Sequence, residues 1–361
     1  MKRILLRLAL AVACLAVVGA IALRSVAVDT WLFRSFVHHA VGGGDTRLAS
    51  ADELSVLLVG TGTPLPDPTR AGPSTMIAAG EHLYLVDTGV DAARNLSRWK
   101  VPLDKVDAVL ITHLHSDHIG GMAEIRLQTW VAGRKTPLKV YGPPGIEAVV
   151  AGFNAAYAID DGYRVAHHGA EFLPPSGAAL VAVPVTIAPG ATTAPVFDDA
   201  GLKVTAIKVT HHPADPAYGY RFDFDGRSVT VSGDTIYDEN LARAAEGTDV
   251  LVHEALAPGL VGIMHDEMMA AGRPRAAQIM HDIPGYHTAP VEAARIANMA
   301  HAKLLLFTHL LPIVPDTPVM LRAFLEGVDE VRPSGVEVGH DGVLVALPAH
   351  SAALEISDLS R

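Results

Sequence analysis

Short apolar runs, bounded by glycine, proline and polar residues, recur along the chain from residue 54 onward. Runs of this length that are rich in β-branched residues predict buried strands. We place these strands at residues 54–59, 76–87, 106–112, 138–141, 180–187, 204–209, 220–232, 249–254, 304–308 and 336–347. Three of the ranges contain a central turn and predict hairpins, namely 76–87, 220–232 and 336–347.

Apolar residues recur at helical spacing between several of these strands, which predicts helices at residues 119–131, 146–157, 290–299 and 316–325. Strands that alternate with helices in this way predict an α/β fold. Two other stretches are less regular. In residues 159–202, we expect His167 and His168 to be solvated. Residues 256–286 are rich in methionine and histidine, which suits either a flexible apolar wall or a packed helix pair.

The first 22 residues combine a basic start with a long apolar run. This pattern is typical of an export signal that is cut near Ala22 or kept as a membrane anchor. We therefore expect a signal peptide or anchor at 1–22, a linker at 23–52, the main domain at 53–350 and a C-terminal tail at 351–361. The expected location is periplasmic or secreted, or at the inner membrane if the leader is uncleaved. Cys14, the only cysteine, lies in the leader, so the rest of the chain offers no thiolate ligand.

Residues 112–121, with the sequence THLHSDHIGG, concentrate the side chains that bind metals in proteins. They comprise His113, His115, Asp117 and His118. Three later apolar runs also lead to a residue of this kind, and these residues are His211, Asp234 and His309. Ligands collect where the strands of an open α/β sheet end, so we expect the four endings to converge. Seven ligand groups are too many for one tetrahedral zinc ion and fit two.

Two further choices concern the residues around this site. Adjacent strand residues point to opposite faces, so only one of His211 and His212 can face the metals, and we choose His211. Asp87 ends another apolar strand. We expect it to orient a ligand histidine, with a surface turn as the alternative.

Together, HLHSDH, the single His211, SGD and the final THL resemble the metallo-β-lactamase fold superfamily, and within it the ribonuclease Z and AtsA-like arylsulfatase branch. The stretches GTGTP, LVDTG, YGPPG and VLVHEA support the resemblance, which covers residues 54–347. It implies an α/β fold with the αββα sandwich, in which two mixed β-sheets pack face to face with helices outside.

The resemblance also implies the roles of the site residues. By family position, one metal takes His113, His115 and His211, the other takes Asp117, His118 and His309, and Asp234 bridges them. Two zinc ions, with manganese or iron as alternatives, would hold the hydroxide that attacks the substrate. The HEA and HT positions of ribonuclease Z relatives imply His287 as proton donor, with Glu254 behind it. The expected catalytic residues are Asp117, His287 and Glu254, although His287 could also be only a neighbour of a helix start.

Three features weigh against a ribonuclease Z: the export leader, the lack of an obvious basic, Gly-Pro-rich arm to grip transfer RNA, and the charge balance. The stretches GYRFDFDGRSV and PADPAYGY also look more like the arylsulfatase group. The chain has a formal net charge of -11, which falls to -14 if the three basic residues of the leader are removed. A surface this acidic repels a phosphate backbone. Many metallo-β-lactamases carry Cys or Ser where this chain has Asp234, so the resemblance favours a phosphate or sulfate ester over a β-lactam.

We therefore expect a dinuclear zinc hydrolase of small sulfate or phosphate esters, of the arylsulfatase or phosphodiesterase type. The alternatives are a ribonuclease Z-like RNA phosphodiesterase and a lactonase or β-lactamase on the same fold. A non-enzymatic metal-binding protein is the least favoured interpretation. The expected partner is a small-molecule ester. No nucleic acid is expected, membrane contact is expected only through the leader, and a homodimer is left open.

Overall fold

The computed structural model describes residues 2–22, 25–41, 48, 50 and 52–360, and the chain divides into two compact units, Met1–Gly44 and Asp45–Arg361. The first unit contains α1 (Lys2–Ala22) and α2 (Val26–Val41). The prediction of a linker at 23–52 was thus incomplete, because α2 has no internal glycine or proline to interrupt a helix. Among the described helices, none combines the length and apolar character that a membrane crossing needs.

The second unit is built on two mixed β-sheets. The first sheet has the order β15-β14-β1-β2-β3-β4-β5-β6, and the second has the order β13-β12-β11-β10-β9-β8-β7. The strands of the first sheet are β1 (Glu53–Gly60), β2 (Ser74–Ala79), β3 (His82–Val86), β4 (Val106–Leu110), β5 (Leu138–Gly142), β6 (Leu180–Pro184), β14 (Val343–Pro348) and β15 (Glu355–Asp358). Those of the second are β7 (Thr193–Asp199), β8 (Leu202–Val209), β9 (Ala217–Phe224), β10 (Arg227–Val231), β11 (Val250–Leu256), β12 (Leu304–Leu311) and β13 (Val336–Val338).

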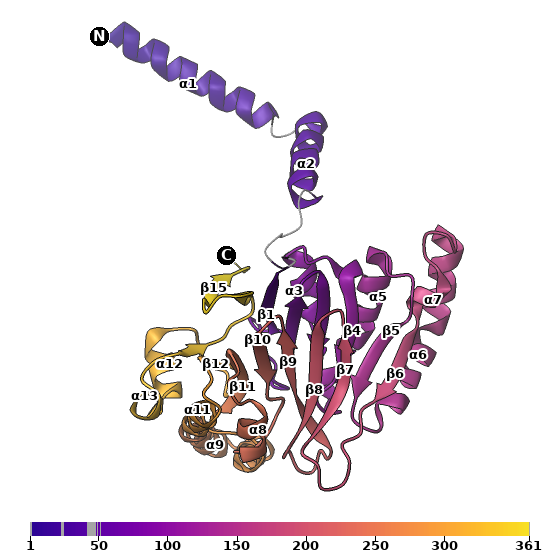
Figure 1. Cartoon of the computed structure of the whole chain (residues 1–361). Coiled ribbons are helices and arrows are strands. Elements are labelled where there is room, and N and C mark those ends of the chain that lie inside the picture. The colour runs from indigo at the N-terminus through magenta and orange to yellow at the C-terminus, as the bar shows by residue number, and fades with distance from the viewer. Residues whose placement is uncertain (1, 23–24, 42–47, 49, 51, 361) are drawn as a thin grey trace. The chain divides into compact units, whose positions relative to one another are not determined.

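Helices cover the outer faces of both sheets (Figure 1). The chain forms α3 (Ala92–Arg98), α4 (Ser116–Ile119), α5 (Met122–Ala132), α6 (Ile146–His168) and α7 (Pro175–Ala178) among the strands of the first sheet. It forms α8 (Glu239–Ala244), α9 (Pro258–Ala270), α10 (Pro274–Asp282), α11 (Pro290–Met299), α12 (Pro318–Phe324) and α13 (Val328–Val331) among those of the second.

Three apolar clusters hold these layers together. One lies between the sheets, where side chains such as Leu110 of β4 and Phe222 of β9 are fully buried. A second packs the first sheet against α3, α5 and α6, and a third packs the second sheet against α8 and α11. Strands covered on both sides read as continuous apolar runs. The αββα sandwich predicted for the chain is thereby confirmed.

The structure corrects some local predictions and decides others. The range 336–347 is not a hairpin, because β13 pairs with β12 in one sheet while β14 pairs with β1 in the other. The predicted tail 351–361 contains β15, which pairs with β14 and so belongs to the sandwich. The helix predicted at 146–157 continues to His168, and His167 and His168 are exposed at its end. Residues 256–286 contain the helix pair α9 and α10, one of the two alternatives.

Candidate metal centre

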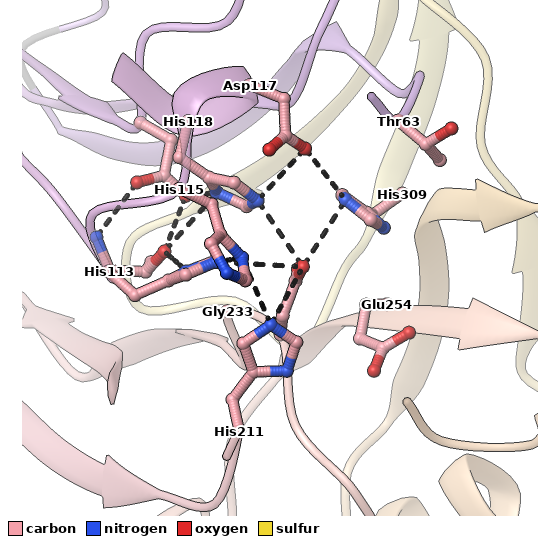
Figure 2. Close-up of polar contacts among 12 residues, drawn as sticks. Thr63, His113, His115, Asp117, His118, His211, Gly233, Glu254 and His309 are labelled. Atoms are coloured by element: carbon pink, nitrogen blue, oxygen red, sulfur yellow. Dashed lines mark hydrogen bonds and ion pairs between the residues drawn. The ribbon is translucent and has the colours of Figure 1, made fainter. Parts of the chain in front are cut away.

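The ends of four strands bring the predicted ligands together. The stretch after β4 carries His113, His115, Asp117 and His118, and α4 begins directly behind His115. The residues after β8 and β10 supply His211 and Asp234, while His309 lies within β12. Figure 2 shows the side chains of His113, His115, Asp117, His118, His211 and His309 pointing toward a common centre. His212, in contrast, is exposed.

Asp234 lies between two groups of ligand-type side chains. Its Oδ2 atom is 3.4 Å from Nε2 of both His118 and His309, and 3.9 Å from Nε2 of both His113 and His211. Asp117 completes the group around His118 and His309, since its Oδ2 lies 3.4 Å from Nε2 of each. A single carboxylate therefore faces four imidazoles that come from three different stretches of the chain.

The other group consists of His113, His115 and His211. Nδ1 of His115 is 2.8 Å from Nε2 of His113 and 3.4 Å from Nε2 of His211. His113 and His211 are buried, whereas His115 is exposed. One side of this group is therefore open to solvent, the side from which a substrate can approach.

The donor set fits divalent cations. Two ligand atoms about 2.1 Å from a tetrahedral zinc ion lie about 3.4 Å apart, which is the spacing in the Asp117, His118, His309 and Asp234 group. Nε2 of His118 is buried without a hydrogen-bond partner. A buried nitrogen without a partner is costly unless a ligand satisfies it. The residues present thus match a metal centre of nitrogen and oxygen ligands.

Asp87 holds the ring of His118 in place. Its Oδ2 accepts a hydrogen bond from Nδ1 of His118 at 2.8 Å, and its Oδ1 accepts one from the Thr112 amide at 2.8 Å. The first contact puts the ring proton on Nδ1 and leaves the lone pair of Nε2 facing Asp117 and Asp234. Asp87 is buried, so the surface-turn alternative does not describe it.

Burial and charge set the protonation of the site. Burial lowers the pKa of His113 well below its ordinary value and that of His211 to about 4, so both rings are neutral at neutral pH. Burial would raise the pKa of Asp234, but His309 and His118 outweigh it and hold that pKa well below its usual range. Burial would lower the pKa of His118, but nearby carboxylates, Asp234 first among them, outweigh it and raise that pKa well above its ordinary value, so a cation bound at Nε2 would have to displace a proton. The ionised Asp234 and the neutral His113 and His211 are in the protonation state in which these groups bind cations.

Glu254 and His287 adjoin the centre. Oε1 of Glu254 accepts hydrogen bonds from the amides of Thr235 and Thr288, at 3.2 and 3.0 Å. The same oxygen lies 3.2 Å from Nδ1 of His287, at an angle that does not make a hydrogen bond. Burial, with Asp234 nearby, raises the pKa of Glu254 well above its usual range, and burial lowers the pKa of His287. The two side chains therefore lie close together beside His211 and His309, without a hydrogen bond between them.

Two features of the site escaped the sequence analysis. The carbonyl of Tyr286 accepts a hydrogen bond from Nδ1 of His211 at 2.8 Å, and a backbone atom leaves no signal in the sequence. His309 has a φ of 46°, a left-handed conformation in the middle of β12. Such backbone strain in a non-glycine residue is typical of functional sites.

A cavity of about 770 Å³ opens beside Asp117. The loop at residues 63–68, together with Arg70, Asp91 and Ser116, forms much of its lining. Ligand pockets commonly have volumes of about 300–1,000 Å³, so this cavity is large enough for part of an extended substrate.

A sandwich of two mixed sheets that gathers histidine and aspartate at its strand ends defines a metal-dependent hydrolase. Residues 67–309 match a family model described as "Metallo-beta-lactamase superfamily". The chain belongs to this superfamily, as its sequence resemblance predicted.

The chain is also similar to individual proteins of this superfamily. Ribonuclease Z of Mycobacterium bovis is 35% identical over 292 residues, which cover 80% of this chain and 96% of the relative. Ribonuclease Z of Mycolicibacterium paratuberculosis is 34% identical over 262 residues, covering 72% of this chain and 86% of the relative. Human tRNase Z, short form, shares the fold with a TM-score of 0.57 at 20% identity, over 81% of this chain and 99% of the human protein.

These relatives overturn two predictions, the hydrolysis of small sulfate or phosphate esters and the absence of a nucleic-acid partner. The net charge of the whole chain was one ground for both, beside the export leader and the lack of an obvious basic arm. That total does not describe the field at one site, where bound cations are the largest local charges.

Proposed function

We propose that this protein is a ribonuclease Z-like phosphodiesterase that hydrolyses RNA at a centre of two divalent cations. The identity of 35% to a ribonuclease Z, over nearly the full length of that relative, supports RNA as the substrate. The observation that carries the dinuclear centre is the position of Asp234, whose Oδ2 lies 3.4 to 3.9 Å from histidines of both ligand groups.

The ligand types favour zinc, with manganese or iron as alternatives. Cations held there would supply an activated water molecule and neutralise the charge that develops on the phosphodiester. The first cation would be held by His113, His115 and His211, the second by Asp117, His118 and His309, and Asp234 would contact both.

His287 and Glu254 move the proton that the leaving oxygen needs. Nε2 of His287 donates a proton to that oxygen, and a rotation of the ring would bring Nδ1 into line with the Glu254 carboxyl group, whose Oε1 lies 3.2 Å away, to recover one. Two backbone amides fix Oε1, so the carboxyl group cannot turn away from the ring without breaking these hydrogen bonds. The cavity beside Asp117 gives the RNA chain space to extend away from the scissile bond.

The test compares an RNA transcript that contains a transfer RNA with 4-nitrophenyl sulfate and a β-lactam. We expect the zinc-loaded protein to cut the RNA, a chelator to abolish the cleavage, and elemental analysis to give close to two metal ions per chain. His287→Ala should slow cleavage by about 100-fold or more, the usual contribution of a general acid. His82→Ala is the matched control, because the exposed His82 also contacts a carboxylate, 2.8 Å away in Asp107. Intact RNA in the presence of metal-loaded protein would refute the proposal.

A further inference from the structure

Helices α1 and α2 expose large apolar side chains, whereas most large apolar side chains in the rest of the described chain are buried. In α2, Trp31, Phe33 and Phe36 are each 65–68% exposed, and in α1, Leu5 and Leu8 are 61% and 58% exposed. An exposed group of large aromatic and aliphatic side chains on a short segment marks an interaction surface.

The chemistry of α1 specifies the environment that this surface requires. From residue 8 to residue 22 the sequence LALAVACLAVVGAIA contains no charged side chain. A helix that is apolar around its circumference is stable where its surroundings are apolar on every side. A partner that covers only one stripe of α1 would therefore leave apolar surface in water.

Charge is divided unevenly along the chain. Residues 1–44 contain five Lys or Arg and one Asp, a net charge of +4, whereas the remaining residues carry -15. Lys2, Arg3 and Arg7 lie next to the apolar run, and Arg34 lies in α2. The occupant of this surface must therefore combine an apolar interior with negative groups at its boundary.

We propose that α1 and α2 attach the protein to an anionic lipid bilayer. Lying lengthwise at the boundary between headgroups and acyl chains, α1 would place its apolar run among acyl chains without crossing the bilayer, and acidic headgroups would neutralise the basic residues beside it. Tryptophan is enriched at the boundary between headgroups and acyl chains, which suits Trp31 in α2. A second copy of this chain could supply negative charge, but most of the apolar residues of its sandwich are buried between and behind the sheets.

Co-sedimentation of the full-length protein with lipid vesicles tests the proposal without using catalysis, so its result is independent of the proposed function. We expect the protein to sediment with vesicles of phosphatidylcholine mixed with phosphatidylglycerol, and to bind more weakly to phosphatidylcholine alone. Changing Lys2, Arg3 and Arg7 to glutamine should weaken binding to the mixed vesicles by about fivefold for each charge removed.

A second pair of variants separates the apolar contribution from general surface effects. Changing Trp31, Phe33 and Phe36 to serine should weaken binding to the mixed vesicles, because α2 then loses its exposed aromatic side chains while α1 is unchanged. The matched control changes Ile159, Tyr163 and Phe172 to serine, since these side chains are 63–70% exposed on and beside α6. It should leave the binding unchanged.

Three results would overturn the proposal. The first is full-length protein that stays in the supernatant with both kinds of vesicle. The second is an equal loss of binding in the control triple variant. The third is a mass measurement on protein isolated from membranes that finds residues 1–22 removed.

Discussion

The role of Asp87 can be tested with a single change of one atom. Asp87→Asn keeps the size of the side chain, and asparagine tolerates the left-handed backbone of this position, where φ is 61°. The amide oxygen can still accept the hydrogen bond from the Thr112 amide. The new NH₂ group, however, replaces the oxygen that lies 2.8 Å from Nδ1 of His118.

Two donors cannot face each other at that distance, so the proton of His118 must move from Nδ1 to Nε2. Nε2 is the atom that lies 3.4 Å from both Asp117 and Asp234, and it would lose the lone pair with which it binds a cation. Loss of a partner that orients a ligand histidine typically weakens metal binding by about 10- to 100-fold, or about 1.4–2.7 kcal/mol.

Competition between the protein and a zinc chelator measures this affinity directly. The matched control is Asp107→Asn, because Asp107 lies 2.8 Å from Nδ1 of His82 with both side chains about half exposed. We expect the control to bind zinc as the unchanged protein does. An unchanged zinc affinity in Asp87→Asn, or an equal loss in the control, would show that Asp87 does not set the tautomer of His118.

Two other predictions concern stability. Asp249 accepts hydrogen bonds from Arg227 and Lys303, at 3.1 and 2.6 Å, and Asp249→Asn should cost about 3–5 kcal/mol because it leaves the buried Arg227 without its counter-charge. Burial would raise the pKa of Asp249, but Lys303 and Arg227 outweigh it and lower that pKa. The stabilisation by these ion pairs is therefore complete above the unfolded pKa of 3.8 and is lost as the pH falls through the lower folded pKa. Urea titrations should show the difference in unfolding free energy between Asp249→Asn and the unchanged protein shrink from neutral to acid pH, and a constant difference would contradict this. In Gly121→Ala, the new Cβ would lie 2.2 Å from the carbonyl oxygen of Gly89. The melting temperature should therefore fall, and the free energy of unfolding should decrease by about 1–3 kcal/mol. Gly152→Ala in α6, with no atom within 4 Å of the new Cβ, should be neutral or stabilising, and similar melting temperatures for the two variants would refute the steric argument.

The ligand residues could be found in the sequence because each follows or lies in a continuous apolar run. Strands buried on both faces leave this signal, and their ends meet at one edge of an α/β sheet. The choice of His211 over His212 followed from the alternation of side chains along a strand. The structure buries His211 in the cluster and leaves His212 exposed, although the ligand role itself stays a prediction.

Other features had no distinct pattern in the sequence. The range 336–347 looks like a hairpin, because a chain that leaves one sheet for the other also shows two apolar runs around a turn. β7 was missed because its residues TAPVFDD are only partly buried at a sheet edge. The substrate was misjudged in part because a sum of charges carries no information about where the charges lie.

The two ligand groups have a consequence for folding, because they join the halves of the sandwich. His113, His115, Asp117 and His118 follow a strand of the first sheet, while His211, Asp234 and His309 belong to the second. Cations bound by both sets would cross-link the two sheets, and binding to the native state alone would favour that state. The supply of metal would then govern the amount of folded protein in the cell, and a shortage of metal would first increase proteolysis of the partly unfolded chain.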